Sequence, residues 1–170
     1  WLDTAHIDFE RKVILVLGAG VTGLSIVRWL ARKGAVVVLA DSRIDAPGAS
    51  QIRREFPEMT TYMGSFKDSI FTGIDMVVSS PGVPLEDIPL QKLQKIGVPV
   101  FGDIEIFLRE NAKNEGGKVV AITGTNGKST VTRMVERILQ ECGLDAVAVG
   151  NIGVPVLDVL EQIERRARKM

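Results

Sequence analysis

The chain has 170 residues, 45% hydrophobic and 25% charged, and its 21 Lys and Arg residues balance 21 Asp and Glu residues. Because these charges balance, the protein has no net positive field that would attract polyanions at long range, which argues against nucleic acid as a partner. No apolar run reaches the ~20 residues of a membrane span and no signal-peptide pattern is present, so we expect a cytoplasmic protein without membrane contacts. The single cysteine, Cys142, excludes an internal disulfide, and we expect it to pack as a small apolar side chain.

The first part of the chain alternates apolar runs with stretches of helical spacing. The apolar runs predict strands at 13–17, 35–40, 60–63, 76–79 and 98–101, and the helical spacing predicts helices at 24–30, 50–56 and 90–96. Gly34 stands where a left-handed cap is expected after the first helix. Strands that are apolar on both faces and alternate with helices predict an α/β fold. We expect residues 1–102 to form a Rossmann-like parallel sheet domain with helices on both sides.

A glycine-rich turn follows the first predicted strand. Residues 18–23 read Gly-Ala-Gly-Val-Thr-Gly, which satisfies the dinucleotide pattern G-x-G-x-x-G, and Asp41 ends the second strand. Taken alone, this pattern favours NAD(P), with another nucleotide or a packing turn as alternatives. The helix N-terminus binds any diphosphate, Thr22 can donate a hydroxyl and Asp41 can accept from a sugar or base, so a UDP-sugar fits equally well.

A second unit is predicted for residues 103–170. It begins with a helix at 104–110 and a polar loop at 111–118, and continues with a strand at 119–122, a glycine turn, a helix at 128–142, a strand at 146–149 and a helix at 154–168. Two strands are too few to close a sheet over a core. We therefore expect this unit to be a truncated central ATP-binding domain of the P-loop type.

The glycine turn of this second unit has the composition of a phosphate loop. Residues 123–130 read Thr-Gly-Thr-Asn-Gly-Lys-Ser-Thr and lie between a predicted strand and a predicted helix. Gly124 and Gly127 allow close approach of the backbone to phosphate, Lys128 adds a charge, and Ser129 or Thr130 offers a hydroxyl to Mg²⁺. The general Walker pattern is not met, because Ile122 occupies the position that it reserves for glycine.

Five ordered motifs together resemble the Mur ligase family, in which the shorter loop TGTNGKST is found. The likeness covers residues 12–160, and its motifs are Leu17–Ser25, Ser79–Val83, Gly102–Phe107, Ala121–Thr130 and Gly150–Pro155. The resemblance implies an ATP-dependent, amide-forming ligase of peptidoglycan synthesis, and hence a role in cell-wall biogenesis, cell shape and cell division. The second phosphate loop also reverses the preference for NAD(P), because a simple dehydrogenase has no use for ATP and Mg²⁺.

The resemblance also implies the site residues. The UDP-substrate would contact Gly20, Val21, Thr22 and Gly23 at the diphosphate, Asp41 and Ser42 at the uracil end, Ser80, Pro81 and Gly82 in the same cleft, and Asn151 near the junction of the units. ATP would lie on Gly124, Thr125, Asn126, Gly127, Lys128, Ser129 and Thr130, with Lys128 catalytic and Ser129 forming part of a Mg²⁺ site.

The implied substrates are UDP-N-acetylmuramoyl-L-alanine and D-glutamate, with ATP and Mg²⁺. The alanyl carboxylate would take the γ-phosphoryl group of ATP to become an acyl phosphate, which the amino group of D-glutamate would attack. The family's further metal-binding residues and its third domain do not occur in this sequence. We therefore expect an N-terminal fragment that is inactive alone.

Two other classes of function remain open at this point. One is a non-catalytic nucleotide-binding or UDP-sugar-binding module, which the isolated chain would resemble in solution. The other is an NAD(P)-dependent oxidoreductase, which the first glycine loop alone would favour. The oligomeric state stays open as well.

Overall fold

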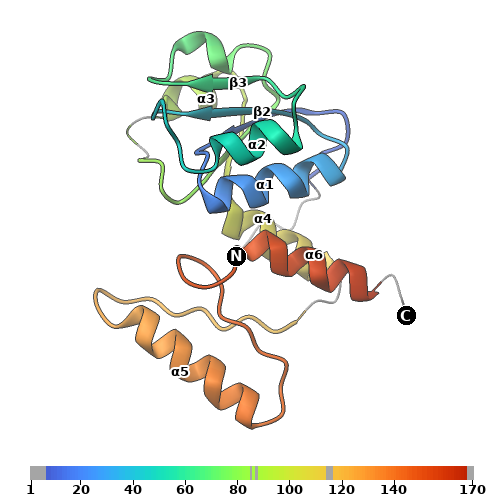
Figure 1. Ribbon diagram of the computed structural model, residues 1–170, viewed down its shortest axis with the longest axis vertical. Coiled ribbons are helices and arrows are strands. Elements are labelled where there is room, and N and C mark those ends of the chain that lie inside the picture. The colour runs from blue at the N-terminus through green and yellow to red at the C-terminus, as the bar shows by residue number, and fades with distance from the viewer. Residues whose placement is uncertain (1–6, 85, 87, 114–116, 168–170) are drawn as a thin grey trace.

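The computed structural model describes residues 7–84, 86, 88–113 and 117–167. Its centre is a five-stranded parallel sheet in the order β3-β2-β1-β4-β5, and the order reverses between β1 and β4 (Figure 1). The strands are β1 (Val13–Leu17), β2 (Val36–Asp41), β3 (Thr61–Met63), β4 (Met76–Ser79) and β5 (Val100–Gly102). The helices are α1 (Val21–Arg32), α2 (Ala49–Glu55), the 3-10 helix η1 (Asp68–Phe71), α3 (Leu90–Lys95), α4 (Asp103–Lys113), α5 (Lys128–Glu141) and α6 (Val156–Ala167).

The middle strand β1 supplies side chains to two separate hydrophobic clusters. Ile14 and Val16 pack in one cluster with residues of α1, α2, α4 and α6. Leu15 and Leu17 pack in the other, together with residues of η1 and α3. Because successive side chains of a strand point to opposite faces, each cluster covers one face of the sheet. The predicted parallel α/β sheet with helices on both sides is confirmed.

Two helices beyond residue 102 complete the larger cluster. Ile106 of α4 is fully buried in it, and so are Leu157 and Leu160 of α6, which join Trp29 of α1. Figure 1 shows α4 and α6 side by side beneath α1. Part of the segment 103–167 therefore folds against the first unit, and the division of the chain into domains 1–102 and 103–170 stays a prediction.

Two predicted strands are wrong. Residues 119–122 and 146–149 are irregular, and the latter contribute only an isolated bridge from Val149 to Val154. Both segments are apolar, but a strand exists only when a neighbouring strand takes up its hydrogen bonds, and within the described residues neither segment has such a partner. Val120 is accordingly 61% exposed.

The helix α5 lies apart from the sheet and has no buried residue (Figure 1). Its apolar side chains include Ile138, which is 60% exposed. Cys142, which ends this helix, is also exposed, so the prediction that it packs against apolar neighbours is wrong. A cysteine on an amphipathic helix is buried only if another element covers that face of the helix, and none of the described elements does.

Most other predicted elements are present with small shifts at their ends. The last helix is described as Val156–Ala167, and Arg168, which the prediction included, lies outside the described residues. The short helix η1 was not predicted from the sequence. Within the described ranges, no helix is both long and apolar enough to cross a lipid bilayer.

Candidate functional site

The first glycine loop lies at the carboxyl edge of the sheet, where the strand order reverses. Gly18 has φ +97°, and a Cβ atom there would lie 3.0 Å from the Cβ atom of Ser80 and 3.0 Å from Val83 Cγ2. The loop after β1 and the loop after β4 are therefore in close contact. In open α/β sheets this reversal point is where ligands bind.

The N-terminus of α1 is open toward this edge. Gly20 caps the helix without any side-chain hydrogen bond, and the first turn contains no acidic residue. Val21 is 74% exposed, and a Cβ atom on Gly20 would have no neighbour within 4 Å. Gly23 differs, because a Cβ atom there would lie 1.8 Å from the carbonyl oxygen of Gly18. Gly23 therefore allows α1 to pack tightly, whereas Gly20 leaves room for an anion at the backbone N–H groups.

Asp41, at the end of β2, is hydrogen-bonded to the glycine loop through Ala19. Its Oδ2 atom accepts hydrogen bonds from Ala19 N at 2.7 Å and Arg43 Nη2 at 2.7 Å. Its Oδ1 atom accepts from Arg43 N at 2.8 Å and Arg43 Nε at 2.9 Å. Burial raises the pKa of Asp41, but the hydrogen bonds and charge of Arg43 and the bond from Ala19 outweigh it and lower that pKa to about 2. The carboxylate is charged and has four donors, so its acceptor capacity is used within the protein.

The other residues predicted for the UDP-substrate occupy the same edge, with one exception. Ser42 is exposed directly after Asp41, and Ser80 is buried with its N–H donating to Leu17 O at 2.9 Å. Pro81 and Gly82 follow as exposed turn residues. Asn151 is different, since it lies exposed in the loop that precedes α6. The structure thus brings most of the predicted UDP site together around the first glycine loop.

The second glycine loop begins α5 in the manner expected of a phosphate loop. Gly124 has φ +150° and Gly127, the N-cap, has φ +78°, while the first turn of α5 has no acidic residue and no side-chain cap. Lys128 folds back, and its Nζ atom donates to the carbonyl oxygens of Gly124 and, at 3.3 Å, Thr125. Ser129 and Thr130 are exposed. The loop thus combines backbone N–H groups, a lysine ammonium group and two exposed hydroxyls, all of which can donate hydrogen bonds to an anion.

The two glycine loops are separate in this structure, because α5 lies away from the sheet (Figure 1). Two side-chain hydrogen bonds tie α5 to the chain that follows it: Gln140 Nε2 donates to Ala146 O at 2.8 Å, and Ala148 N donates to Glu136 Oε1 at 2.7 Å. The bond from Ala148, together with Arg133, lowers the pKa of Glu136. No group of three or more His, Cys, Asp or Glu residues suited to a metal ion occurs in the described part of the chain.

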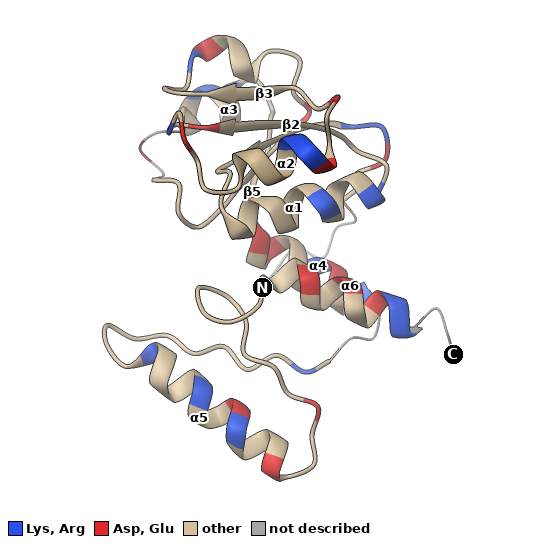
Figure 2. Cartoon of the chain, in the orientation of Figure 1, with Lys and Arg blue, Asp and Glu red and all other residues tan. Residues whose placement is uncertain are grey.

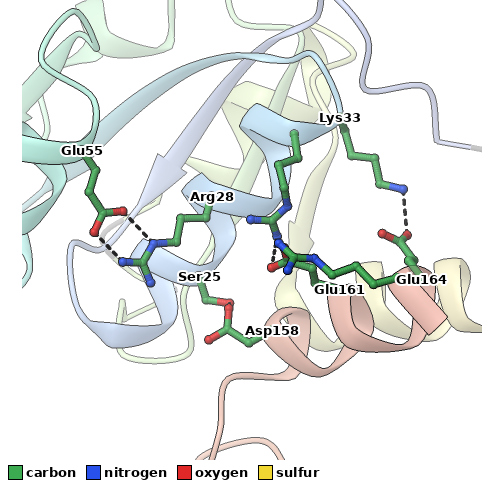
Figure 3. A network of polar contacts seen from close by, with 9 residues as sticks. Ser25, Arg28, Lys33, Glu55, Asp158, Glu161 and Glu164 are labelled. Atoms are coloured by element: carbon green, nitrogen blue, oxygen red, sulfur yellow. Dashed lines mark hydrogen bonds and ion pairs between the residues drawn. The ribbon is translucent and has the colours of Figure 1, made fainter. Parts of the chain in front are cut away.

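Sequence reasoning missed two residues close to the first loop. Ser25 of α1 donates its hydroxyl to Asp158 Oδ1 of α6 at 2.7 Å (Figure 3). Asp158 also lines a cavity of about 230 Å³ together with Gly20 and Val21. Ser25 ends the first of the five motifs but was not among the predicted site residues, Asp158 belongs to no motif, and the two are far apart in the sequence. Only the packing of α6 on α1 shows that they meet.

Comparison with known proteins finds relatives that match most of this chain. The chain is 47% identical over 154 residues to the UDP-N-acetylmuramoylalanine–D-glutamate ligase of Methylobacillus flagellatus, covering 91% of this chain and 34% of that protein. It is 41% identical over 159 residues to the ligase of the same name from Nitrosospira multiformis, covering 92% and 34%. The chain thus spans about a third of the length of these relatives.

A solved structure shares the fold. A pseudomurein peptide ligase type C from Methanothermus fervidus superposes with a TM-score of 0.50 at 24% identity, over 92% of this chain and 31% of that one. Residues 12–102, more than half of the chain, match the family described as Mur ligase MurD-like, N-terminal domain. Because this match includes the whole sheet and the loop that opens α1, the chain belongs to the Mur ligase family and carries its MurD-like N-terminal domain.

Proposed function

We propose that this chain carries the UDP-substrate-binding unit and the ATP phosphate loop of a ligase that adds D-glutamate to UDP-N-acetylmuramoyl-L-alanine in peptidoglycan synthesis. The observation that carries the proposal is the uncapped N-terminus of α1 at the reversal point of a parallel sheet, where a diphosphate would meet backbone N–H groups and no acidic residue of that turn. The names of relatives at 40–47% identity support it.

In this proposal the diphosphate of the UDP-substrate lies on residues 20–23. Gly20 leaves the space, Val21 and Gly23 offer N–H groups, and Thr22 offers its hydroxyl in addition. Ser42 lies at the uracil end of the site, and Ser80 lies across the cleft with Pro81 and Gly82. Asn151 would contact the substrate from the loop before α6.

The environment of Asp41 argues against NAD(P) as the ligand. A dinucleotide fold uses the acidic residue after the second strand to accept the hydroxyls of the ribose. Here both oxygens of Asp41 are taken by Ala19 and Arg43. In a UDP site, Asp41 would accordingly hold the glycine loop and Arg43 in place, and neighbouring residues would make the direct contacts with the ligand.

The second glycine loop would bind ATP. Gly124, Thr125, Asn126 and Gly127 would surround the phosphates, and Lys128 would exchange its carbonyl partners for phosphate oxygens. Ser129, with Thr130 beside it, would offer a hydroxyl to Mg²⁺. The bound nucleotide would supply the phosphoryl group that activates the alanyl carboxylate for attack by the amino group of D-glutamate.

Calorimetric titration of the 170-residue chain with UDP, Mg-ATP and NADH tests the proposal. UDP and Mg-ATP should bind, and NADH should bind more weakly than UDP. Thr22→Ala should weaken UDP binding by about 1 kcal/mol, the usual value of one hydrogen bond, without changing ATP binding. Lys128→Ala should weaken Mg-ATP binding about tenfold or more and leave UDP binding unchanged. Equal affinity for NADH and UDP would contradict the assignment.

The 170-residue chain by itself should not catalyse ligation. Phosphoryl transfer requires the acceptor to be held in line with the nucleotide, and a misplacement of about 1 Å can cost 10²-fold in rate. In the described residues the two glycine loops belong to separate parts of the structure. ADP formation that depends on both UDP-N-acetylmuramoyl-L-alanine and D-glutamate would refute this expectation.

A further inference from the structure

The helix α6 brings an acidic residue to the N-terminus of α1. Val156, Leu157 and Leu160 anchor α6 in the main hydrophobic cluster, each at most 1% exposed. This anchoring places Asp158 against Ser25, whose Oγ atom donates to Asp158 Oδ1 at 2.7 Å (Figure 3). Since Ser25 is itself only 1% exposed, its hydroxyl fixes the orientation of the Asp158 carboxylate.

The carboxylate faces a cavity that begins at the glycine loop. Its volume is about 230 Å³, and its walls include Gly20, Val21, Gly48, Gln51 and Asp158. Whole ligands usually occupy ~300–1,000 Å³, so this cavity suits one part of a larger ligand, about the size of a single sugar ring. It adjoins the N–H groups on which a diphosphate would lie.

The second oxygen of Asp158 is available to a ligand. Figure 3 shows it pointing away from Ser25, and in residues 7–84, 86, 88–113 and 117–167 no donor is hydrogen-bonded to it. Arg28, also on the wall of the cavity, is held by Glu55 through Nε–Oε2 and Nη2–Oε1 contacts of 2.7 and 2.5 Å. The cavity wall therefore carries the N-terminus of α1, the charged acceptor Asp158 and the guanidinium of Arg28, which is paired with Glu55.

We propose that Asp158 accepts a hydrogen bond from a hydroxyl or amide N–H on the sugar portion of a nucleoside diphosphate sugar. The inference rests on the proposed function, because it takes the diphosphate to lie on Gly20 and Val21. A carboxylate next to that position repels additional phosphate and favours neutral hydrogen-bond donors. Asp158 thus selects a diphosphate that continues into a sugar over one that ends in phosphate.

The docking of α6 does not by itself require Asp158. Two ion pairs further along the helices, Arg32–Glu161 at 2.6 Å and Lys33–Glu164 at 2.8 Å, hold α6 against α1 (Figure 3). Figure 2 shows the same arrangement as basic residues on α1 above acidic residues on α6. Glu161 lies on the same helix but does not line the cavity, so Glu161→Gln is a matched control for Asp158→Asn.

The test compares two ligands, UDP and UDP-N-acetylmuramoyl-L-alanine, on the 170-residue chain and both variants. Asp158→Asn keeps one oxygen that can accept from Ser25. It replaces the second, charged oxygen with an uncharged amide group that donates hydrogen bonds. It should weaken binding of the sugar-containing ligand about tenfold and should change the affinity for UDP by less than twofold. Glu161→Gln should leave both affinities within about twofold. Emission from Trp29, recorded with Trp1→Phe, verifies that α6 stays docked in each variant.

The outcomes are distinct. If the unchanged chain does not bind UDP, the proposed function fails, and the inference fails with it. If UDP binds but Asp158→Asn leaves the affinity for the sugar-containing ligand unchanged, the inference alone is overturned. It is also overturned if Glu161→Gln causes an equal loss, which would assign the effect to helix docking, or if Asp158→Asn changes the affinities for both ligands equally.

Discussion

Gly20 and Gly23 occupy the same short turn, but a methyl group would meet different surroundings at each position. At Gly23 the added carbon would lie 1.8 Å from Gly18 O, a backbone atom of the strand-to-helix turn. At Gly20 no atom lies within 4 Å, and the backbone is extended, with φ −93°. Gly23 is therefore needed for packing, and Gly20 keeps the surface in front of α1 open.

We expect Gly23→Ala to lower the free energy of unfolding by about 3 kcal/mol or more, because the backbone must shift to relieve the overlap. Gly20→Ala should change it by less than about 1 kcal/mol but weaken UDP binding, since its methyl group projects into the space proposed for the diphosphate. Urea unfolding and calorimetry on both variants measure these effects. Equal unfolding free energies for the two variants would contradict the close packing of Gly23 against Gly18.

The lowered pKa of Asp41 predicts a specific dependence of stability on pH. A carboxyl group with a folded-state pKa below its unfolded value stabilises the fold above the unfolded pKa, and this contribution is lost as the pH falls. For Asp41 the shift from 3.8 to about 2 corresponds to about 2 kcal/mol, lost mainly between pH 4 and pH 2.

Urea unfolding of the protein and of Asp41→Asn at pH 7 and pH 2 checks this prediction. The amide cannot form the ion pair with Arg43, so the variant should be less stable by about 2 kcal/mol at pH 7, and the difference should nearly vanish at pH 2. A stability difference that is the same at both pH values would show that Asp41 acts through packing and not through its charge.

At the scale of elements, α5 and α6 are both amphipathic helices of the segment beyond residue 102, but only α6 is covered. Leu160 of α6 is fully buried in the main cluster, whereas no residue of α5 is buried. The apolar faces of the two helices are alike in sequence, so periodicity alone does not distinguish them. The difference comes from α1 and α4, which cover the apolar face of α6.

Substitutions on the two helices should therefore have unequal effects. Leu160→Ala removes buried methyl groups and leaves a cavity, so it should lower the free energy of unfolding by about 2–5 kcal/mol. Ile138→Ala, the matched change on the exposed face of α5, should change it by less than about 0.5 kcal/mol. Thermal or urea unfolding of the chain distinguishes these cases, and comparable losses would mean that α5 is covered in solution.

At the scale of the whole molecule, the structure combines a sheet that is covered on both faces with a loosely attached segment. The strand β1 exchanges hydrogen bonds with both β2 and β4, while residues 119–122 belong to no ladder of the described structure. Backbone groups that are exposed to water open at little cost in free energy, whereas those of a central strand open only with most of the fold.

Hydrogen exchange should show this division directly. Amides of residues 14–17 should exchange on the order of a thousandfold or more slowly than those of residues 119–122, which corresponds to an opening free energy higher by about 4 kcal/mol. Amides of α6 should follow β1, since the helix shares its core. Similar protection of residues 119–122 and β1 would show that the apolar segment has found a partner in solution.

Local patterns in the sequence were sufficient to predict the parallel sheet, most of its helices, the left-handed conformation of Gly34 and both glycine loops. Alternation, helical spacing and glycine positions are properties of neighbouring residues, so they can be recognised without knowledge of the fold. The resemblance to the Mur ligases, which the family match bears out, rests on the same short motifs.

Other features depend on residues that meet only after folding. These include the occupation of the Asp41 carboxylate by Ala19 and Arg43, and the docking of α6 that brings Asp158 to Ser25. They also include the failure of residues 119–122 and 146–149 to form strands. A run of apolar residues determines a preference for burial, but not the partner that buries it or completes its hydrogen bonds. Only the tertiary structure decides that, because the partner is supplied by a distant part of the chain.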